Sequence, residues 1–247
     1  MSTESFRPRP NTSTTTILRG VRFYGRMWLD LQVWTVQRDL RRRLPAYRGD
    51  VPDVGCGQSP YRFLLDKETM TYTGIDTIDV ERFDYVNPEI VPFNGEHIPF
   101  PDGHFDAVIC TEVLEHVSNF QQLVYEIHRV MKEGAEVIVT VPWSARFHYV
   151  PYDFFRYTPS SLNSMFGGFA NSNVTSRGAD LSVIGSKLVV VWFRNAFPTQ
   201  RRRIAWSSLW VIASPLFFLA ILVARLCTQF DVGSSDDPLG CTIVSTK

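Results

Sequence analysis

Residues 53–59 read Asp-Val-Gly-Cys-Gly-Gln-Ser and close a short apolar run, Val51–Val54. The two glycines permit a tight turn in which a ligand can approach the backbone without meeting a Cβ atom. Ser59 suits a helix N-cap and Pro60 suits the first helical position, so we predict a helix from about Pro60. Such a helix start directs amide hydrogens and a partial positive charge at a ligand in the turn.

Short apolar runs and helical patterns alternate on the C-terminal side of this turn. The predicted strands are Val51–Val54, Tyr72–Ile75, Phe105–Cys110 and Val137–Val141, and a helical pattern covers Asn119–Lys132. Repeated strand, helix and strand indicate parallel pairing with right-handed crossovers. We therefore predict an α/β fold with a Rossmann-like, doubly wound sheet, mostly parallel, with an antiparallel last strand in residues 238–247. Ligands of such sheets lie beyond the carboxyl ends of the strands.

Asp76 ends the second predicted strand, close to the glycine turn in such a sheet. Its carboxylate can accept hydrogen bonds from both hydroxyls of a ribose. Nicotinamide enzymes place an acidic residue at the same spacing, so the geometry alone leaves a dinucleotide and other nucleoside cofactors open.

Four segments, in this order, resemble the class I S-adenosylmethionine-dependent methyltransferases, in particular their type 11 small-molecule group. They are Asp53–Gly57, Gly74–Asp76, His97–Cys110 and Thr111–Val117. The resemblance covers about residues 50–169, with the final strand as a weaker match. The nicotinamide alternative loses support, because the third glycine of the dinucleotide pattern would fall at Pro60.

The resemblance implies a methyltransferase whose cofactor is S-adenosylmethionine. The glycine turn would lie against the methionine portion, Asp76 would hold the ribose, and Asn94–Gly95 would border the adenine. Thr111–Glu112 would face the sulfonium. The predicted cofactor-binding residues are Asp53, Gly55, Cys56, Gly57, Asp76, Thr77, Asn94, Gly95 and Thr111.

Two residues depart from the family pattern. Ser59 stands where the family has a third glycine, which is compatible with the predicted N-cap. Pro52 lies inside the first strand, where its missing amide hydrogen should cost a ladder hydrogen bond and displace the turn. The alternative function is therefore a membrane-attached cofactor-binding or scaffold protein that kept the fold without turnover.

Methyl transfer from a sulfonium is an in-line displacement that mainly needs an aligned acceptor and a dry site. A hydroxyl acceptor needs a base, whereas a neutral amine or a thiolate does not. The predicted catalytic residues are His116, Glu112 and His148. The alternative for His116 is a residue that shapes the loop beside the cofactor. We expect Glu115 to be a surface or hydrogen-bonding residue without a chemical role.

The segment Trp143–Tyr157 is rich in aromatic residues and precedes Thr158, which should cap a helix. Its aromatic side chains suit a lid over a sugar, an aromatic ring or a lipid, and Arg156 suits a phosphate or carboxylate. The alternative is that the aromatics fill the core and Arg156 pairs with Asp153. The predicted substrate-binding residues are Tyr152, Asp153, Arg156 and Tyr157. We expect a small-molecule acceptor, with a glycan or lipid-linked precursor as the favoured class.

The predicted organisation has a disordered lead-in (1–16), a basic amphipathic helical cap (17–47) and a methyltransferase domain (48–247) with a hydrophobic insertion (204–224). The insertion carries no formal charge, and its roughly 21 residues would span about 31 Å as a helix, enough for a hydrocarbon layer. A crossing helix, a hairpin broken near Pro215, an interfacial helix and a buried helix all remain open. We predict peripheral or monotopic association with a membrane.

Bulk composition excludes several classes of protein. The 25 basic and 25 acidic residues balance, and 45% of residues are hydrophobic, so we predict no nucleic-acid partner. About ten arginines but only four acidic residues precede Asp53, a patch that suits an anionic surface or a solvated helix face. The four cysteines form no Cys-x-x-Cys pair, so we predict neither a disulfide framework nor a metal site. The N-terminus has no signal-peptide pattern, which favours the cytoplasm, and the oligomeric state stays open.

Overall fold

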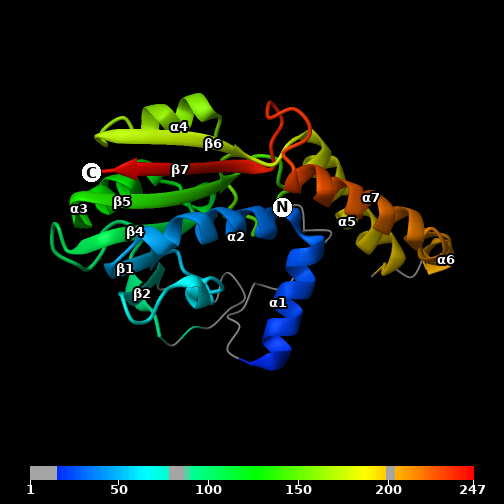
Figure 1. The fold of residues 1–247 in the computed structure, drawn as a ribbon, viewed down its shortest axis with the longest axis horizontal. Coiled ribbons are helices and arrows are strands. Elements are labelled where there is room, and N and C mark those ends of the chain that lie inside the picture. The colour runs from blue at the N-terminus through cyan, green and yellow to red at the C-terminus, as the bar shows by residue number, and fades with distance from the viewer. Residues whose placement is uncertain (1–15, 78–86, 88, 199–203) are drawn as a thin grey trace.

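The computed structural model describes residues 16–77, 87, 89–198 and 204–247. Its centre is a seven-stranded sheet in the order β3-β2-β1-β4-β5-β7-β6 (Figure 1). The strands from β3 to β5 are parallel, whereas β7 runs antiparallel to both β5 and β6. The predicted doubly wound α/β fold with an antiparallel last strand is confirmed. The predicted lead-in lies almost entirely outside the described residues.

The elements have the following bounds. The strands are β1 (Gly49–Val54), β2 (Met70–Thr77), β3 (Val91–Phe93), β4 (Phe105–Thr111), β5 (Met131–Pro142), β6 (Asn171–Arg177) and β7 (Gly240–Thr246). The α-helices are α1 (Ile17–Leu29), α2 (Leu31–Arg43), α3 (Phe120–Val130), α4 (Pro159–Met165), α5 (Asp180–Ala196), α6 (Ile204–Ile212) and α7 (Ser214–Gln229). Short 3₁₀ helices include η2 (Arg62–Leu64) and η4 (Leu114–His116).

Alternate residues of the central strands supply two separate cores, because successive side chains of a strand point to opposite faces. On one face, Val108 of β4 joins the side chains of α3 and α4 in the larger core. On the other face, Ile109 packs against α2 through Val36 and Leu40. The carboxyl ends of β1, β2 and β4 therefore stay open for a ligand at one edge of a two-faced core.

Pro52 does not displace the first strand. The pairing of β1 with β2 runs without a break from Gly49 to Val54 and includes Pro52 opposite Thr73. The expected cost of a missing ladder bond therefore leaves the position of the following turn unchanged.

The helix predicted from Pro60 is wrong. Residues 55–69 form turns and the short η2. Ser59 has a φ of 52°, in the left-handed region, whereas an N-cap residue is extended. The Ser59 hydroxyl is also hydrogen-bonded to Tyr72 Oη at 2.8 Å, so it cannot cap a helix. The ligand turn is consequently not followed by the start of an α-helix.

Most of the predicted helical cap consists of the two helices α1 and α2. Asp30 ends α1 and caps α2, since its carboxylate accepts a hydrogen bond from the Val33 amide at 3.3 Å. The helix α2 packs on the sheet, whereas α1 leaves several apolar side chains exposed. Thr158 caps α4 as predicted, and Asn119 caps α3.

The helices α5, α6 and α7 extend beyond the end of the sheet (Figure 1). Gly185 of α5 lies against Ala224 of α7, and an added Cβ there would come within 2.3 Å of the Ala224 Cβ. The predicted hydrophobic insertion divides at Ala213, two residues before Pro215, as in the alternative of a broken helix pair. Among the described helices, none is by itself long and apolar enough to cross a membrane, but Ala205–Ile212 and Ser214–Gln229 meet that criterion together with a bend of 53°.

Candidate functional site

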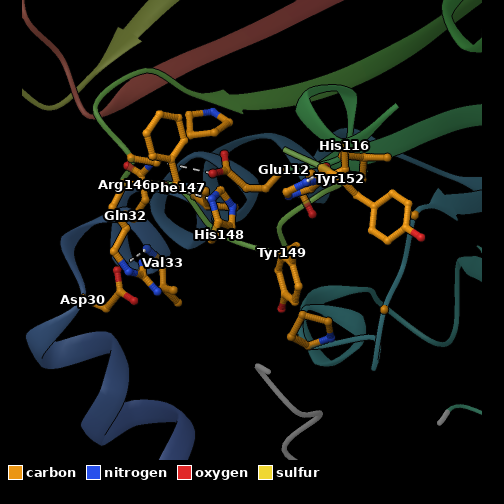
Figure 2. A pocket seen from close by; sticks show the side chains of 18 of the residues that line it. Asp30, Gln32, Val33, Glu112, His116, Arg146, Phe147, His148, Tyr149 and Tyr152 are labelled. Atoms are coloured by element: carbon orange, nitrogen blue, oxygen red, sulfur yellow. Dashed lines mark hydrogen bonds between the residues drawn. The ribbon is translucent and has the colours of Figure 1, made fainter. Parts of the chain in front are cut away.

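A cleft of about 1510 Å³ opens at the carboxyl ends of β1, β2, β4 and β5. Its walls also include α2 and the loop after β5 (Figure 2), together with residues of α1 and α5. Nearly all of the predicted cofactor-binding residues line it: Gly55, Cys56, Gly57, Asp76, Thr77, Asn94, Gly95 and Thr111. The glycine turn and the acidic end of the neighbouring strand therefore border one shared cavity.

The glycine turn is fixed directly to Asp76. Gly55 and Gly57 have φ values of 74° and 53°, which L side chains rarely adopt. The Gly57 amide donates to Asp76 Oδ2 at 2.7 Å, and the other carboxylate oxygen accepts from the Thr77 amide at 2.7 Å. These bonds hold the carboxylate beside the turn, where it can reach a ribose.

Asp53 is placed differently from the other predicted cofactor residues. It is buried beneath the turn and does not line the cleft. Tyr72 Oη lies 3.1 Å from its carboxylate. Burial raises the pKa of Asp53 to about 7, because the charged form is poorly solvated there. Asp53 therefore supports the glycine turn from below, instead of facing the cofactor as predicted.

This burial predicts a pH-dependent stability. The folded-state pKa of Asp53 is about 7, against an ordinary value of 3.8. The stability that the protonated carboxyl group allows is therefore fully present below about pH 4 and is lost as the pH rises through 7, because the buried group resists ionisation. Asp53→Asn should therefore increase the free energy of unfolding at pH 8 by at most about 4 kcal/mol relative to the wild type. A higher melting temperature at pH 8 would report this gain. The gain should vanish near pH 4. Asp236→Asn, on an exposed loop, controls for the lost charge. A gain that does not change with pH would contradict this interpretation of Asp53.

Glu112 follows β4 and has a φ of 55°, so a strained backbone aims its side chain. One carboxylate oxygen accepts a hydrogen bond from Arg177 Nη2 at 2.5 Å. Arg177 lies on β6 and is fully buried. No sequence pattern points to this partner, because β6 was not predicted and Arg177 is far from Glu112 along the chain. The pair fixes a negative charge at the wall of the cleft.

The comparisons with known proteins agree with this geometry. Residues 52–139 match the family model described as a methyltransferase domain. This part of the chain is a methyltransferase domain, and the fold around it is that of the class I methyltransferases. S-adenosylmethionine is the cofactor of this class, and the cleft that holds Gly55 and Asp76 is where the domain would bind it.

Two curated relatives and one solved structure are similar to this methyltransferase domain. An uncharacterized protein of Methanocaldococcus jannaschii is 36% identical over 91 residues, 37% of this chain and 40% of that protein. A demethylmenaquinone methyltransferase of Listeria welshimeri is 29% identical over 100 residues, 36% of this chain and 42% of that protein. A SAM-dependent methyltransferase structure from Archaeoglobus fulgidus superposes with a TM-score of 0.54 at 16% identity, covering 92% of this chain and 99% of that one. The chain thus spans about two fifths of the length of these curated relatives.

Two predicted catalytic histidines meet in the methyltransferase cleft. The rings of His116 and His148 have centroids 4.8 Å apart, and both side chains line the cavity (Figure 2). Burial and the neighbouring His148 lower the pKa of His116 to about 4, so its imidazole is neutral at pH 7. The structure therefore brings together His116, His148 and Glu112 at the end of β4.

The expectation for Glu115 is wrong. Its side chain is fully buried, and neither carboxylate oxygen has a hydrogen-bond partner among the described residues. Burial, and then the charge of Glu112, raise the pKa of Glu115 well above its ordinary value. Glu115 belongs to η4, which turns it inward beneath the loop after β5, and a local pattern cannot reveal such a turn.

The four predicted substrate residues divide into two groups. Tyr152 lines the cleft, whereas Asp153, Arg156 and Tyr157 do not. Arg156 donates to both oxygens of Asp153, at 2.6 and 2.9 Å, which is the pairing left open by the sequence. Tyr157 lies in the core and donates to the Leu114 carbonyl at 2.9 Å. The side chains of Asp153, Arg156 and Tyr157 therefore hold the loop in place and do not face the cavity.

Several residues of the cleft were absent from the predicted set. They are contributed by elements far from the motifs: Gln32 of α2, Phe147 and Tyr149 of the loop, and Lys187 and Arg194 of α5. Tyr149 has a φ of 54°, which marks it as a residue held in a strained conformation. The aromatic density of residues 143–157 was the available signal for the loop members, and α5 gave none.

Proposed function

We propose that this chain transfers a methyl group from S-adenosylmethionine to a small acceptor that a membrane presents, with a lipid-linked or glycan precursor as the substrate class. The observation that carries the proposal is the shared cleft. The glycine turn and Asp76 border it at the carboxyl ends of the strands, and His116, His148 and the aromatic loop line the same cavity. A donor and an acceptor can thus lie in one cavity.

The cofactor would occupy the part of the cleft at the ends of β1, β2 and β4. Its ribose would bond Asp76, and its adenine would lie by Asn94–Gly95, which line the same wall. The carboxylate of Glu112, fixed by Arg177, would lie near the sulfonium and complement its positive charge. These assignments rest on the family pattern and on the position of each residue in the cleft.

The acceptor would approach beside the two histidines. A neutral His116 imidazole can accept a proton from an acceptor hydroxyl, since a base is effective only in its unprotonated form. His148 lies beside it, and Tyr152 borders the same cavity. Phe147 and Tyr149 supply aromatic faces that suit a ring or an isoprenoid chain.

The surface around α1 and α7 supports a membrane-presented acceptor. Exposed apolar side chains cover both helices: Ile17, Leu18, Val21, Tyr24, Trp28, Leu216, Leu219, Leu222, Val223 and Leu226. Arg225 ties α7 to the end of α1, because it donates to the Met27 and Trp28 carbonyls at 3.2 and 3.1 Å. Arginines lie between the apolar residues of α1, a pattern that suits an anionic lipid surface. The cleft extends along α1 and α5, toward this surface.

The test uses the purified chain with a donor that carries a deuterated methyl group. Membrane lipids extracted from the source cells are reconstituted in vesicles that contain anionic phospholipid, and the aqueous extract is assayed in parallel. Mass spectrometry should find the label in the lipid fraction, at least about tenfold above the aqueous fraction, because a membrane-bound acceptor meets the enzyme at high local concentration.

A surface variant separates presentation from chemistry. Ile212→Ser with Leu216→Ser and Leu219→Ser changes exposed side chains only. It should lose vesicle binding in co-sedimentation and transfer to vesicles, and keep transfer to detergent-solubilised acceptor. Label confined to the aqueous fraction would contradict the lipid class. Cofactor binding without any labelled product would favour the protein without turnover.

A further inference from the structure

Glu115, His116 and His148 form a compact group, here named the Glu115 cluster. One ligand atom from each residue lies within 4.8 Å of the other two. Glu115 and His116 follow β4 in η4, whereas His148 belongs to the loop after β5, so the fold brings together residues far apart in sequence. His116 Nε2 lies 3.7 Å from Glu115 Oε1. The cluster borders the cleft through both histidines (Figure 2).

The Glu115 carboxyl group is the unusual member of the cluster. Its side chain is fully buried, and within the described part of the chain neither oxygen finds a hydrogen-bond donor. Buried carboxyl groups are ordinarily hydrogen-bonded, paired with a cation or bound to a metal. An oxygen of Glu115 faces His116, so the group is aimed into the cluster and not into the apolar core.

Both imidazole rings of the cluster are held through Nδ1. His116 Nδ1 lies 2.7 Å from the Tyr152 carbonyl oxygen, and His148 Nδ1 lies 3.0 Å from that of Arg146. A carbonyl oxygen only accepts, so Nδ1 carries the proton and Nε2 keeps the lone pair in each ring. Histidines that bind metals are commonly oriented in this way, by an Nδ1–H bond to a carbonyl group.

We propose that the Glu115 cluster binds one divalent transition-metal ion, through Glu115 and through Nε2 of His116 and His148. Two imidazoles and one carboxylate suit zinc, cobalt, iron or manganese, and suit magnesium poorly. Ligand atoms about 2.1 Å from a tetrahedral ion lie about 3.4 Å apart, so binding requires side-chain rotations that contract the cluster. The remaining coordination position faces the cleft.

A metal at this position also specifies the acceptor, on the condition that the proposed methyl transfer is correct. The ion would bind an acceptor hydroxyl and lower its pKa, so that the proton passes to water. The bound oxygen would attack the methyl carbon as the carbon–sulfur bond breaks, and the electron pair would stay on sulfur. The products are a methyl ether and S-adenosylhomocysteine. The substrate class is then a hydroxylated acceptor, and the ion takes over the activation of the hydroxyl that His116 would provide as a base in the metal-free site.

The test titrates the full chain, freed of metal by a chelator, with Co²⁺ and Zn²⁺ and without cofactor. The expected result is one ion per chain and a visible Co²⁺ absorption of a low-symmetry nitrogen and oxygen site. Glu115→Gln and His148→Gln should each weaken binding at least about tenfold, since each removes a ligand. His97→Gln is the matched control, because His97 lies 3.0 Å from the Glu126 carboxylate but outside the cluster. Its affinity should equal that of the wild type.

Each outcome decides the proposal. The proposal is overturned if the wild type binds no stoichiometric ion. It is also overturned if His97→Gln weakens metal binding as much as Glu115→Gln and His148→Gln do. Circular dichroism and S-adenosylhomocysteine binding check that the variants fold, and His148→Gln, in a surface loop, decides the matter if Glu115→Gln unfolds. If the chain binds S-adenosylhomocysteine but no metal ion, the metal site alone is overturned. Metal binding without binding of that nucleoside would overturn the proposed function alone.

Discussion

Gly55→Val is expected to weaken binding of S-adenosylhomocysteine by at least about 100-fold. The backbone at Gly55 has a φ of 74°, and an added Cβ would come within 2.3 Å of Val113 Cγ2. Strain of a β-branched residue in the left-handed region and overpacking together cost about 3 kcal/mol or more, which is a factor of about 100. The turn must therefore move, and with it the Gly57 amide that holds Asp76. Isothermal titration calorimetry measures the change directly.

Gly134→Val provides the matched control. Gly134 has a φ of 76°, in the same backbone region, but an added Cβ there meets nothing within 4 Å. This variant carries the conformational strain without the clash, and it should bind the nucleoside as the wild type does. Wild-type affinity in Gly55→Val would remove the glycine turn from the cofactor site. In cells, Gly55→Val should abolish function if the chain is an enzyme and spare it if the chain is a scaffold.

Arg177→Met is expected to lower the free energy of unfolding by about 3–5 kcal/mol, because it leaves the charge of Glu112 without its buried partner. Arg177 is fully buried, and its guanidinium also donates to Thr35 Oγ1 at 3.2 Å and to the Val141 carbonyl at 3.1 Å. Those groups lose their donor as well. Chemical denaturation followed by circular dichroism measures the loss.

A double variant tests the cause of that loss. Glu112→Gln added to Arg177→Met removes the stranded charge and should recover more than about 1 kcal/mol. Lys132→Met breaks the half-exposed pair with Asp106 and should cost less than about 1 kcal/mol. A loss in Arg177→Met no larger than that in Lys132→Met would mean that the pair of Arg177 with Glu112 does not stabilise the fold. If Glu112 faces the sulfonium as proposed, the double variant should still lose methyl transfer, because that charge is gone.

The three residues of the proposed metal site come from parts of the chain that are far apart in sequence. The predicted absence of a metal site considered the spacing of the cysteines, whereas the Glu115 cluster consists of oxygen and nitrogen ligands from two separate loops. Glu115 and His116 are adjacent in the sequence, but His148 reaches them only through the loop after β5. Two neighbouring ligand residues without the third are common in proteins and give no specific signal.

Local patterns in the chain were sufficient for the parallel strands, the glycine turn with Asp76 and the cap at Thr158. Each depends on residues within a few positions of one another, where backbone sterics and local hydrogen bonds determine the conformation. Three features depend on the tertiary structure alone. They are the left-handed backbone of Ser59, which is incompatible with the predicted helix, the burial of Glu115, and the pairing of Arg177 with Glu112. These features depend on side chains that meet only after distant strands pair. Their energy comes from desolvation and charge pairing in the folded interior, which no short segment of sequence contains.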